Sequence, residues 1–120
     1  MPGMNILCVF NDEAFSKEGF ASLKQSSYLV TPADCAEEAQ RDFTKDNYQV
    51  VVIGPGLVRS AKEQLALKAW ESGCAVVVVC SEKDDYRIQA DEHVDIKESG
   101  VKLAPMVTRA ITAKFYGVAV

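Results

Sequence analysis

Four consecutive β-branched residues, Val50–Ile53, constrain the fold of this chain more than any other feature. An apolar run without polar alternation is typical of a strand that helices cover on both faces of a parallel sheet. The run ends at Gly54–Gly56, where two glycines and a proline terminate strand pairing and turn the chain. In open α/β sheets, ligands and chemistry lie at the carboxyl edge of such strands. Residue 54 therefore decides much of what the chain can do.

Further apolar strands alternate with helical patterns along the chain. The predicted strands are 5–10, 28–30, 48–53, 75–79 and 93–97, and the predicted helices start near 14, 34, 60 and 104. This alternation predicts an α/β domain with a parallel sheet, because right-handed crossovers place helices on both faces. A chain of 120 residues with this pattern favours a flavodoxin-like three-layer αβα sandwich of strand order 2-1-3-4-5, as one domain over residues 1–120.

Local signals mark several helix ends. Asp34–Glu37 and Ser60–Glu63 both fit a capping box, in which the first side chain caps a helix and the fourth reaches back. Gly73 lies where the third helix should end. Pro105 suits the first turn of the last helix, which Gly117 would terminate.

Composition excludes some classes of function. The chain is 48% apolar and 25% charged, as is usual for a globular domain. A net charge of −4 argues against sequence-independent nucleic-acid binding, which requires a basic face. No apolar stretch approaches the ~18 residues of a membrane span, and no basic segment precedes the first apolar residues. We therefore expect a cytoplasmic protein that binds neither membranes nor nucleic acid directly.

We expect the cysteines to be buried, unpaired thiols of a protein in a reducing compartment. They are Cys8, Cys35, Cys74 and Cys80. None forms a C-x-x-C pair, and His93 is the only histidine, so the paired spacing of a zinc site is missing. A redox role of Cys80 stays open, because Lys97 could lower its pKa at the carboxyl edge of the sheet.

Several short segments together resemble the receiver domains of two-component response regulators, over nearly the whole length from Asn5 to Phe115. The segments that carry this resemblance are Ile6–Glu13 (first strand and acidic pair), Cys35–Ala39 (second helix), Tyr48–Pro55 (third strand), Val76–Ser81 (fourth strand) and Lys97 (end of the fifth strand). The resemblance implies a signalling module of a phosphorelay rather than an enzyme.

The resemblance also implies a phosphoryl pocket at the carboxyl edge of the sheet. Its parts are an aspartate nucleophile, two acids that hold Mg²⁺, and a hydroxyl and a lysine that bind phosphoryl oxygens. The residues at the corresponding places here are Asn11, Asp12, Gly54, Cys80 and Lys97. Gly54 takes the place of the nucleophile and has no side chain to phosphorylate, so the resemblance implies a degenerate pocket without a catalytic residue.

Two of these residues, Asp12 and Lys97, match the receiver pattern. We expect them to pair across the pocket, because partial burial favours an ion pair over isolated charges. No cofactor is expected, and Asp12 is the only candidate ligand for Mg²⁺. Only seventeen positions separate Cys80 from Lys97, which predicts that the fourth helix of a receiver is shortened or missing.

Two functions remain open besides the redox role of Cys80. The first is an atypical receiver-like module that acts without phosphorylation, by contact with a protein partner or by dimerisation. Its candidate interfaces are Leu67, residues 84–90 and the outer face of the last helix. The second is a small α/β protein or enzyme that binds phosphate or a nucleotide at Gly54–Gly56, near the amides that follow Ser60. Pro55 weakens this second hypothesis, because proline lacks an amide donor.

Overall fold

The computed structural model describes residues 4–26, 28–45 and 48–116, and strands alternate with helices throughout these ranges. The elements are β1 (Asn5–Val9), α1 (Glu13–Lys24), β2 (Leu29–Ala33), α2 (Ala36–Lys45), β3 (Val50–Ile53), α3 (Arg59–Glu71), β4 (Ala75–Cys80), the 3₁₀ helix η1 (Lys83–Arg87), β5 (Glu92–Asp95), the 3₁₀ helix η2 (Ile96–Glu98) and α4 (Ser99–Tyr116).

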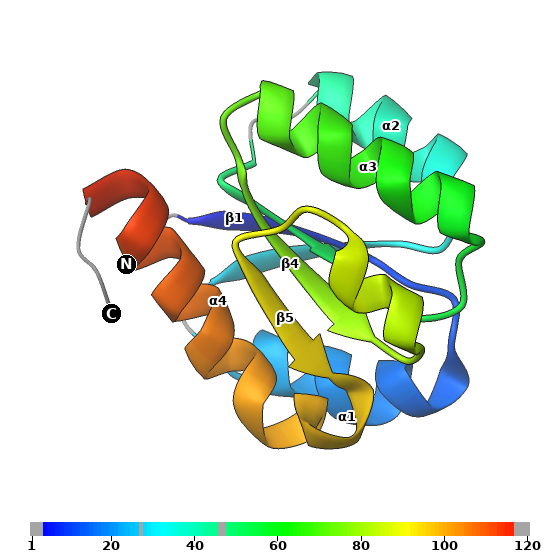
Figure 1. The fold of residues 1–120 in the computed structure, drawn as a ribbon. Helices are drawn as coiled ribbons and strands as arrows, with labels where there is room; N and C mark the ends of the chain where they lie inside the picture. The colour runs from blue at the N-terminus through cyan, green and yellow to red at the C-terminus, as the bar shows by residue number, and fades with distance from the viewer. Residues whose placement is uncertain (1–3, 27, 46–47, 117–120) are drawn as a thin grey trace.

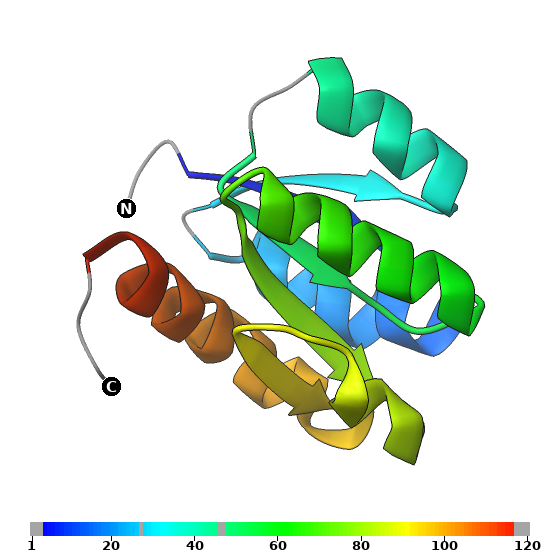
Figure 2. The same cartoon turned by 45° about the horizontal axis from the view of Figure 1, so that its top comes forward.

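The described strands form one parallel sheet in the order β2-β1-β3-β4-β5, as predicted from the sequence. Helices α1 and α4 cover one face of this sheet, and α2 and α3 cover the other (Figures 1 and 2). The three-layer flavodoxin-like architecture is therefore confirmed. None of the helices in the described part of the chain combines the length and apolarity that crossing a membrane requires.

The central strand β3 is buried on both faces, as its sequence predicts. Val51 and Ile53 pack into the apolar cluster under α2 and α3, whereas Val50 and Val52 pack into the cluster under α1 and α4. Because strand side chains alternate between faces, a run of four β-branched residues supplies both clusters equally. Because β3 is the third of the five strands in the sheet order, its carboxyl end lies near the middle of the sheet edge.

The predicted capping box at the start of α2 is wrong. The helix begins at Ala36, and Cys35 Sγ accepts a hydrogen bond from the amide of Glu38 at 3.4 Å. The pattern Asp34–Glu37 has the right spacing, but the chain enters the helix one residue later. Strand β2 also continues through Pro32, where the sequence had suggested a stop; proline is tolerated there because β2 is an edge strand.

The predicted capping box at the start of α3 is wrong as well. Val58 is the N-cap residue and makes no side-chain cap, so Ser60 lies inside the first turn. Glu63 does not cap the backbone amide of Ser60, because its carboxylate binds the side chain of Arg59 at 2.7 Å. At the other end of α3, Gly73 adopts φ +83°, which confirms it as the terminating residue.

The last helix begins at Ser99, five residues before its predicted start. Pro105 therefore lies inside α4 rather than in its first turn. The preceding strand β5 ends early, at Asp95, whose carboxylate accepts the amide of Lys97 at 2.8 Å and starts η2. The predicted end of the helix at Gly117 lies outside the described residues.

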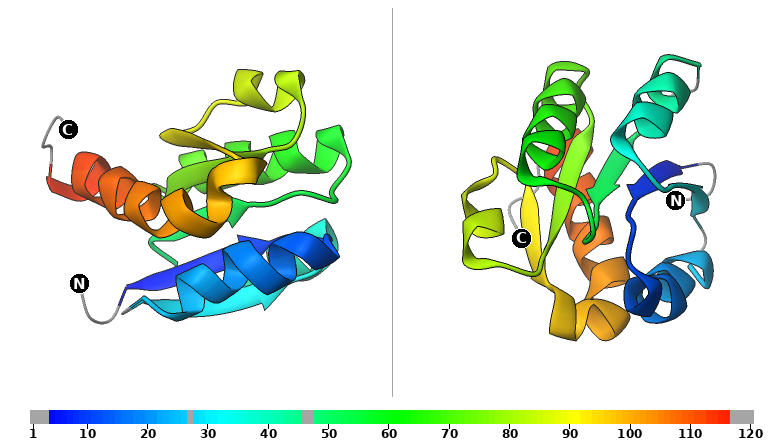
Figure 3. Two further views of the ribbon diagram at one scale, coloured as in Figure 1. Left: turned by 90° about the horizontal axis from the view of Figure 1, so that it is seen from below. Right: turned by 90° about the vertical axis from the view of Figure 1, so that its right-hand side faces the viewer.

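The shortened fourth helix of the sequence prediction is confirmed. Between β4 and β5 the chain forms only the 3₁₀ helix η1, drawn in yellow-green in Figure 1. Figure 3 shows that η1 lies on the same side of the sheet as α3. The two faces of the sheet are thus covered unequally near β5, where α4 packs on one face and a single short turn on the other.

Candidate functional site

The topology brings all predicted site residues to the carboxyl edge of the sheet. Asn11 and Asp12 follow β1, Gly54 follows β3, Cys80 ends β4, and Lys97 follows β5 within η2. Because the strands are parallel, these ends share one edge. The side chains nevertheless point into different surroundings.

The space beside Gly54 is filled by its neighbours. A Cβ atom on residue 54 would lie 2.7 Å from Phe10 Cβ and 3.0 Å from the carbonyl oxygen of Val9. Distances below about 3 Å are too short for non-bonded carbon atoms, which prefer separations of about 3.5–4 Å. The rings of Phe10 and Phe15 pack edge to face at 5.1 Å and close this part of the edge. A side chain at residue 54 would therefore require its neighbours to move.

The Gly54–Gly56 loop lies directly against the loop that follows β1. The amide of Asn11 donates to the carbonyl of Pro55 at 2.8 Å, and the amide of Gly54 donates to Val9. Gly56 adopts φ +94°, and a Cβ atom there would overlap the Asn11 carbonyl. The Gly54 amide is thus already bonded and Pro55 has none, which leaves this loop with few donors for a phosphate.

The expected ion pair between Asp12 and Lys97 is not formed within the described ranges. Asp12 is instead the N-cap residue of α1, and its Oδ1 accepts the amide of Phe15 at 2.9 Å. Lys97 is exposed on η2 and lines a separate shallow depression beside Tyr86. The prediction was wrong because it placed Lys97 in a strand, where its side chain would have stayed at the pocket.

Asp12 lies in a depression with few features of a magnesium site. Glu13 and Glu18 line the same depression, but Lys17 is there too, and its ammonium pairs with Glu13 at 3.4 Å. Mg²⁺ prefers a compact octahedral set of oxygen ligands. Asp12 has one oxygen committed to the helix cap, so it offers one free oxygen to an ion.

Cys80 is a buried thiol. Its side chain is 2% exposed, and its Sγ lies 3.7 Å from the carbonyl oxygen of Val78, to which it donates. Burial, with a further contribution from the nearby charge of Asp85, raises the pKa of Cys80 to about 12. The positive charge that most lowers the pKa of this thiol is that of Lys62, not that of Lys97, and burial outweighs it. Since the thiolate is the reactive form, the geometry does not support redox chemistry at Cys80.

A buried ion pair next to this edge escaped the sequence prediction. Lys62 Nζ, on α3, lies 3.0 Å from Asp85 Oδ1, on η1, and the two residues are only 5% and 3% exposed. Asp85 Oδ2 also accepts the amides of Ser81 and Glu82 at 3.0 and 3.1 Å. These bonds fix η1 to both α3 and the end of β4.

The surroundings of Asp85 favour its charged form. Burial by itself raises the pKa of this carboxyl, but the hydrogen bonds from Lys62 and from two amides outweigh burial and lower the pKa below its usual range. A sequence signal for Lys62 existed, because it precedes Leu65, Ala66 and Ala69 at spacings of three, four and seven residues, on the buried face of α3.

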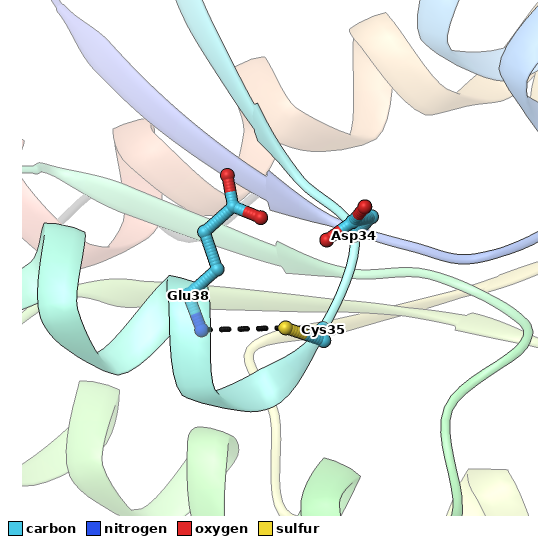
Figure 4. Close-up of side chains that lie close together, drawn as sticks. All are labelled: Asp34, Cys35 and Glu38. Carbon is cyan, nitrogen blue, oxygen red and sulfur yellow. Dashed lines mark hydrogen bonds between the residues drawn. The ribbon is translucent and has the colours of Figure 1, made fainter.

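A second cluster lies at the start of α2. One ligand atom each of Asp34, Cys35 and Glu38 lies within 4.8 Å of the others (Figure 4). The cluster lies at a helix N-terminus, whose dipole favours negative charge, and Cys35 Sγ already accepts the amide of Glu38. The closeness of these three side chains is thus explained by their place at the start of α2.

Solved structures share the fold of this chain. No protein-family model matches the sequence, and no curated protein matches it. A CheY-like response regulator receiver domain from Methanospirillum hungatei superposes with a TM-score of 0.78 at 16% identity, covering 96% of this chain and 98% of the other. Response regulator TrrA from Thermotoga maritima, in complex with Mg²⁺ and BeF, gives 0.72 at 17% identity and coverage of 89% and 98%.

A third match is the signal receiver domain of an HD-domain protein from Pseudomonas fluorescens, with a TM-score of 0.79 at 13% identity and coverage of 95% and 90%. At identities this low the likeness concerns the fold. The receiver-domain fold that the sequence resemblance implied is thereby confirmed.

Proposed function

We propose that this chain is a receiver-like signalling module, not an enzyme, that works without phosphoryl transfer and acts by contact with a protein partner or a second copy. The observation that carries this proposal is the filled space beside Gly54, where a Cβ atom would lie 2.7 Å from Phe10 Cβ. A glycine side chain offers no oxygen to attack a phosphoryl group, and its neighbours crowd the position from which a carboxylate side chain would start.

The remaining residues of the edge support the same proposal. Asp12 is the only carboxylate among the five predicted pocket residues, and one of its oxygens caps α1. Lys97 is exposed on η2, away from Asp12. With the acid and the amine in separate depressions, the edge lacks the converging charges that stabilise a transferred phosphoryl group.

We further propose that the protein works in the cytoplasm and does not bind nucleic acid directly. All four cysteines are free, in keeping with a reducing compartment. The formal net charge of −4 favours protein partners over nucleic acid.

Incubation with acetyl phosphate and Mg²⁺, followed by intact-mass measurement, tests the absence of phosphoryl transfer. We expect no added phosphoryl group, while a receiver domain with its acceptor aspartate, treated in parallel, gains one. Peptide mapping would locate any phosphorylated residue. A stable phosphoryl group on Asp12 would overturn the proposal.

Thiol labelling tests the redox alternative. The exposed Cys35 should react with a maleimide in the folded protein, and Cys80 should react only on unfolding. Cys80 reacting as fast as Cys35 in the folded chain would restore the redox hypothesis.

A further inference from the structure

A groove of about 300 Å³ lies between α3 and the residues that follow η1. Ala66, Leu67 and Trp70 form its helical wall, and Ile88 belongs to the opposite wall. Leu67 and Trp70 are 58% and 41% exposed. Large apolar side chains at the rim of a concave surface are typical of interaction sites.

The groove results from the unequal covering of the sheet. On one face, α4 packs over both β4 and β5, whereas on the other face η1 is the only element between α3 and the β5 edge. One turn of 3₁₀ helix is too short to cover the apolar side of α3 that faces it. Within the described chain no helix thus packs along the outer flank of α3, and the Lys114 side chain of α4 reaches it at Trp70, with Nζ 4.0 Å from the ring centre.

The charges at the rim are unequally neutralised. The Arg59 guanidinium binds Glu63 at 2.7 Å and Asp84 at 2.9 Å, so both of these carboxylates already have a cationic partner. Arg87 is exposed and forms no ion pair with any residue that the structure describes. An uncompensated guanidinium beside an apolar groove is a recognition element for a carboxylate, which it can bind through two parallel hydrogen bonds.

We propose that this groove binds an acidic amphipathic helix of a partner protein, with the helix's apolar stripe between Leu67, Trp70 and Ile88 and one of its carboxylates on Arg87. This proposal rests on the proposed function as an interaction module. A helix fits because side chains line the groove and a helix satisfies its own backbone hydrogen bonds. From Arg59 to Trp70, α3 spans about 16 Å, enough for about three helical turns of a partner.

A second copy of the chain fits the rim less well. In a two-fold contact each copy would present the same surface to the other. Among the described residues that line the groove, Glu63 is the only carboxylate, and Arg59 already binds it. Arg87 of one copy would thus find no free carboxylate among these lining residues of the other, which favours an external acidic partner.

Display selection with a randomised helical library tests the proposal on the full chain. The library presents amphipathic helices whose polar positions are acidic, neutral or basic in equal shares. We expect selection of acidic helices with large apolar residues at i, i+3 or i+4, and i+7. Trp70 is the only tryptophan of the chain, so its emission reports binding of the selected peptides directly.

Matched variants localise the binding. Leu67→Glu and Arg87→Glu should each weaken binding at least about tenfold, the change expected for about 1.4 kcal/mol. Val101→Glu replaces another exposed apolar residue with the same side chain, and Lys83→Glu makes the same charge change on η1. Both controls should bind as the unmodified chain does.

Each other outcome contradicts the proposal. Failure to select any helix, selection regardless of charge, or equal binding by Leu67→Glu and Val101→Glu would overturn it. Sedimentation that reveals a dimer dispersed by Leu67→Glu would assign the groove to a second copy instead. The mass measurement with acetyl phosphate is repeated on the same samples. A phosphoryl group on Asp12 would overturn the proposed function, whereas failure to select any helix, with the mass unchanged, would overturn the groove alone.

Discussion

The carboxyl edge of the sheet is stabilised differently over β1 and β3 than over β4 and β5. Over β1 and β3, backbone hydrogen bonds join the two loops, and Phe10 Cβ, the Val9 carbonyl and the Phe15 ring fill the space beside Gly54. Over β4 and β5, a buried ion pair between Lys62 and Asp85 holds η1 in place. The half over β1 and β3 is thus filled by packed neighbours. The half over β4 and β5 instead contains a buried ion pair and leaves a groove beside α3.

This difference shows two ways in which a sheet edge is stabilised. Where a side chain is missing, at Gly54, apolar neighbours fill the volume, because protein interiors are close-packed. Where a helix is missing, η1 has too few residues to bury an apolar face, so polar bonds to Asp85 anchor it. His93 assists by bonding the carbonyl of Ile88 at 2.8 Å. Polar anchoring fixes the segment but leaves the flank of α3 uncovered.

The largest effect on stability is expected from Asp85→Ala. This change leaves the Lys62 ammonium buried without its partner and frees the amides of Ser81 and Glu82. Removing one member of a buried pair costs about 3–5 kcal/mol of unfolding free energy, measurable by urea denaturation. Asp84→Ala is the control, since Asp84 is half-exposed and its pair with Arg59 contributes about 0–1 kcal/mol. Equal losses in the two variants would mean that the buried pair does not anchor η1.

A smaller loss of unfolding free energy is expected from Gly54→Ala, at the part of the edge over β1 and β3. The added methyl group meets Phe10 Cβ and the Val9 carbonyl, and overpacking of this kind costs about 1–3 kcal/mol. Gly100→Ala is the matched control, because its new Cβ would lie 3.9 Å from the nearest atom, on Glu18. The control should be up to about 1 kcal/mol more stable than the unmodified chain, because alanine has a higher helix propensity than glycine. If Gly54→Ala is as stable as the control, the edge beside β3 is not closed.

The pH dependence of stability distinguishes the halves further. The pKa of Asp85 is lower in the folded chain than the value of about 4 of an unfolded aspartate. Its contribution to stability is therefore fully present above about pH 4 and is lost as the pH falls through the lower folded value. Asp85→Asn should flatten the acid limb of a plot of unfolding free energy against pH. An unchanged acid limb would mean that other carboxyl groups control acid unfolding.

The smallest effect on stability is expected from the contact between Trp70, at the end of α3, and Lys114 of α4. Lys114 Nζ lies 4.0 Å from the centre of the Trp70 ring, a cation–π contact worth about 0.5–1 kcal/mol. Lys114→Met should lose about that much stability and shift the tryptophan emission, whereas Lys83→Met should do neither. An emission spectrum identical to that of the unmodified chain would show that Lys114 does not hold the ring.

The sequence predicted the strands because these depend on local apolar runs, whereas their order was inferred from the number of βα units and the length of the chain. Val50–Ile53 and Ala75–Cys80 are apolar throughout, so burial on both faces is their only stable arrangement. The short interval between Cys80 and Lys97 likewise fixed the shortening of the fourth helix. The capping boxes failed because their spacing alone does not say which residue enters the helix, as Cys35 and Val58 show.

The sequence by itself determined that residue 54 has no side chain and that only Asp12 and Lys97 match the charged residues of a receiver pocket. Tertiary structure alone decided that Phe10 fills the space beside Gly54, that Asp12 and Lys97 lie in separate depressions and that Lys62 finds Asp85. The physical reason is that residue type and spacing are local, whereas packing and ion pairing depend on which segments the fold brings within a few ångströms.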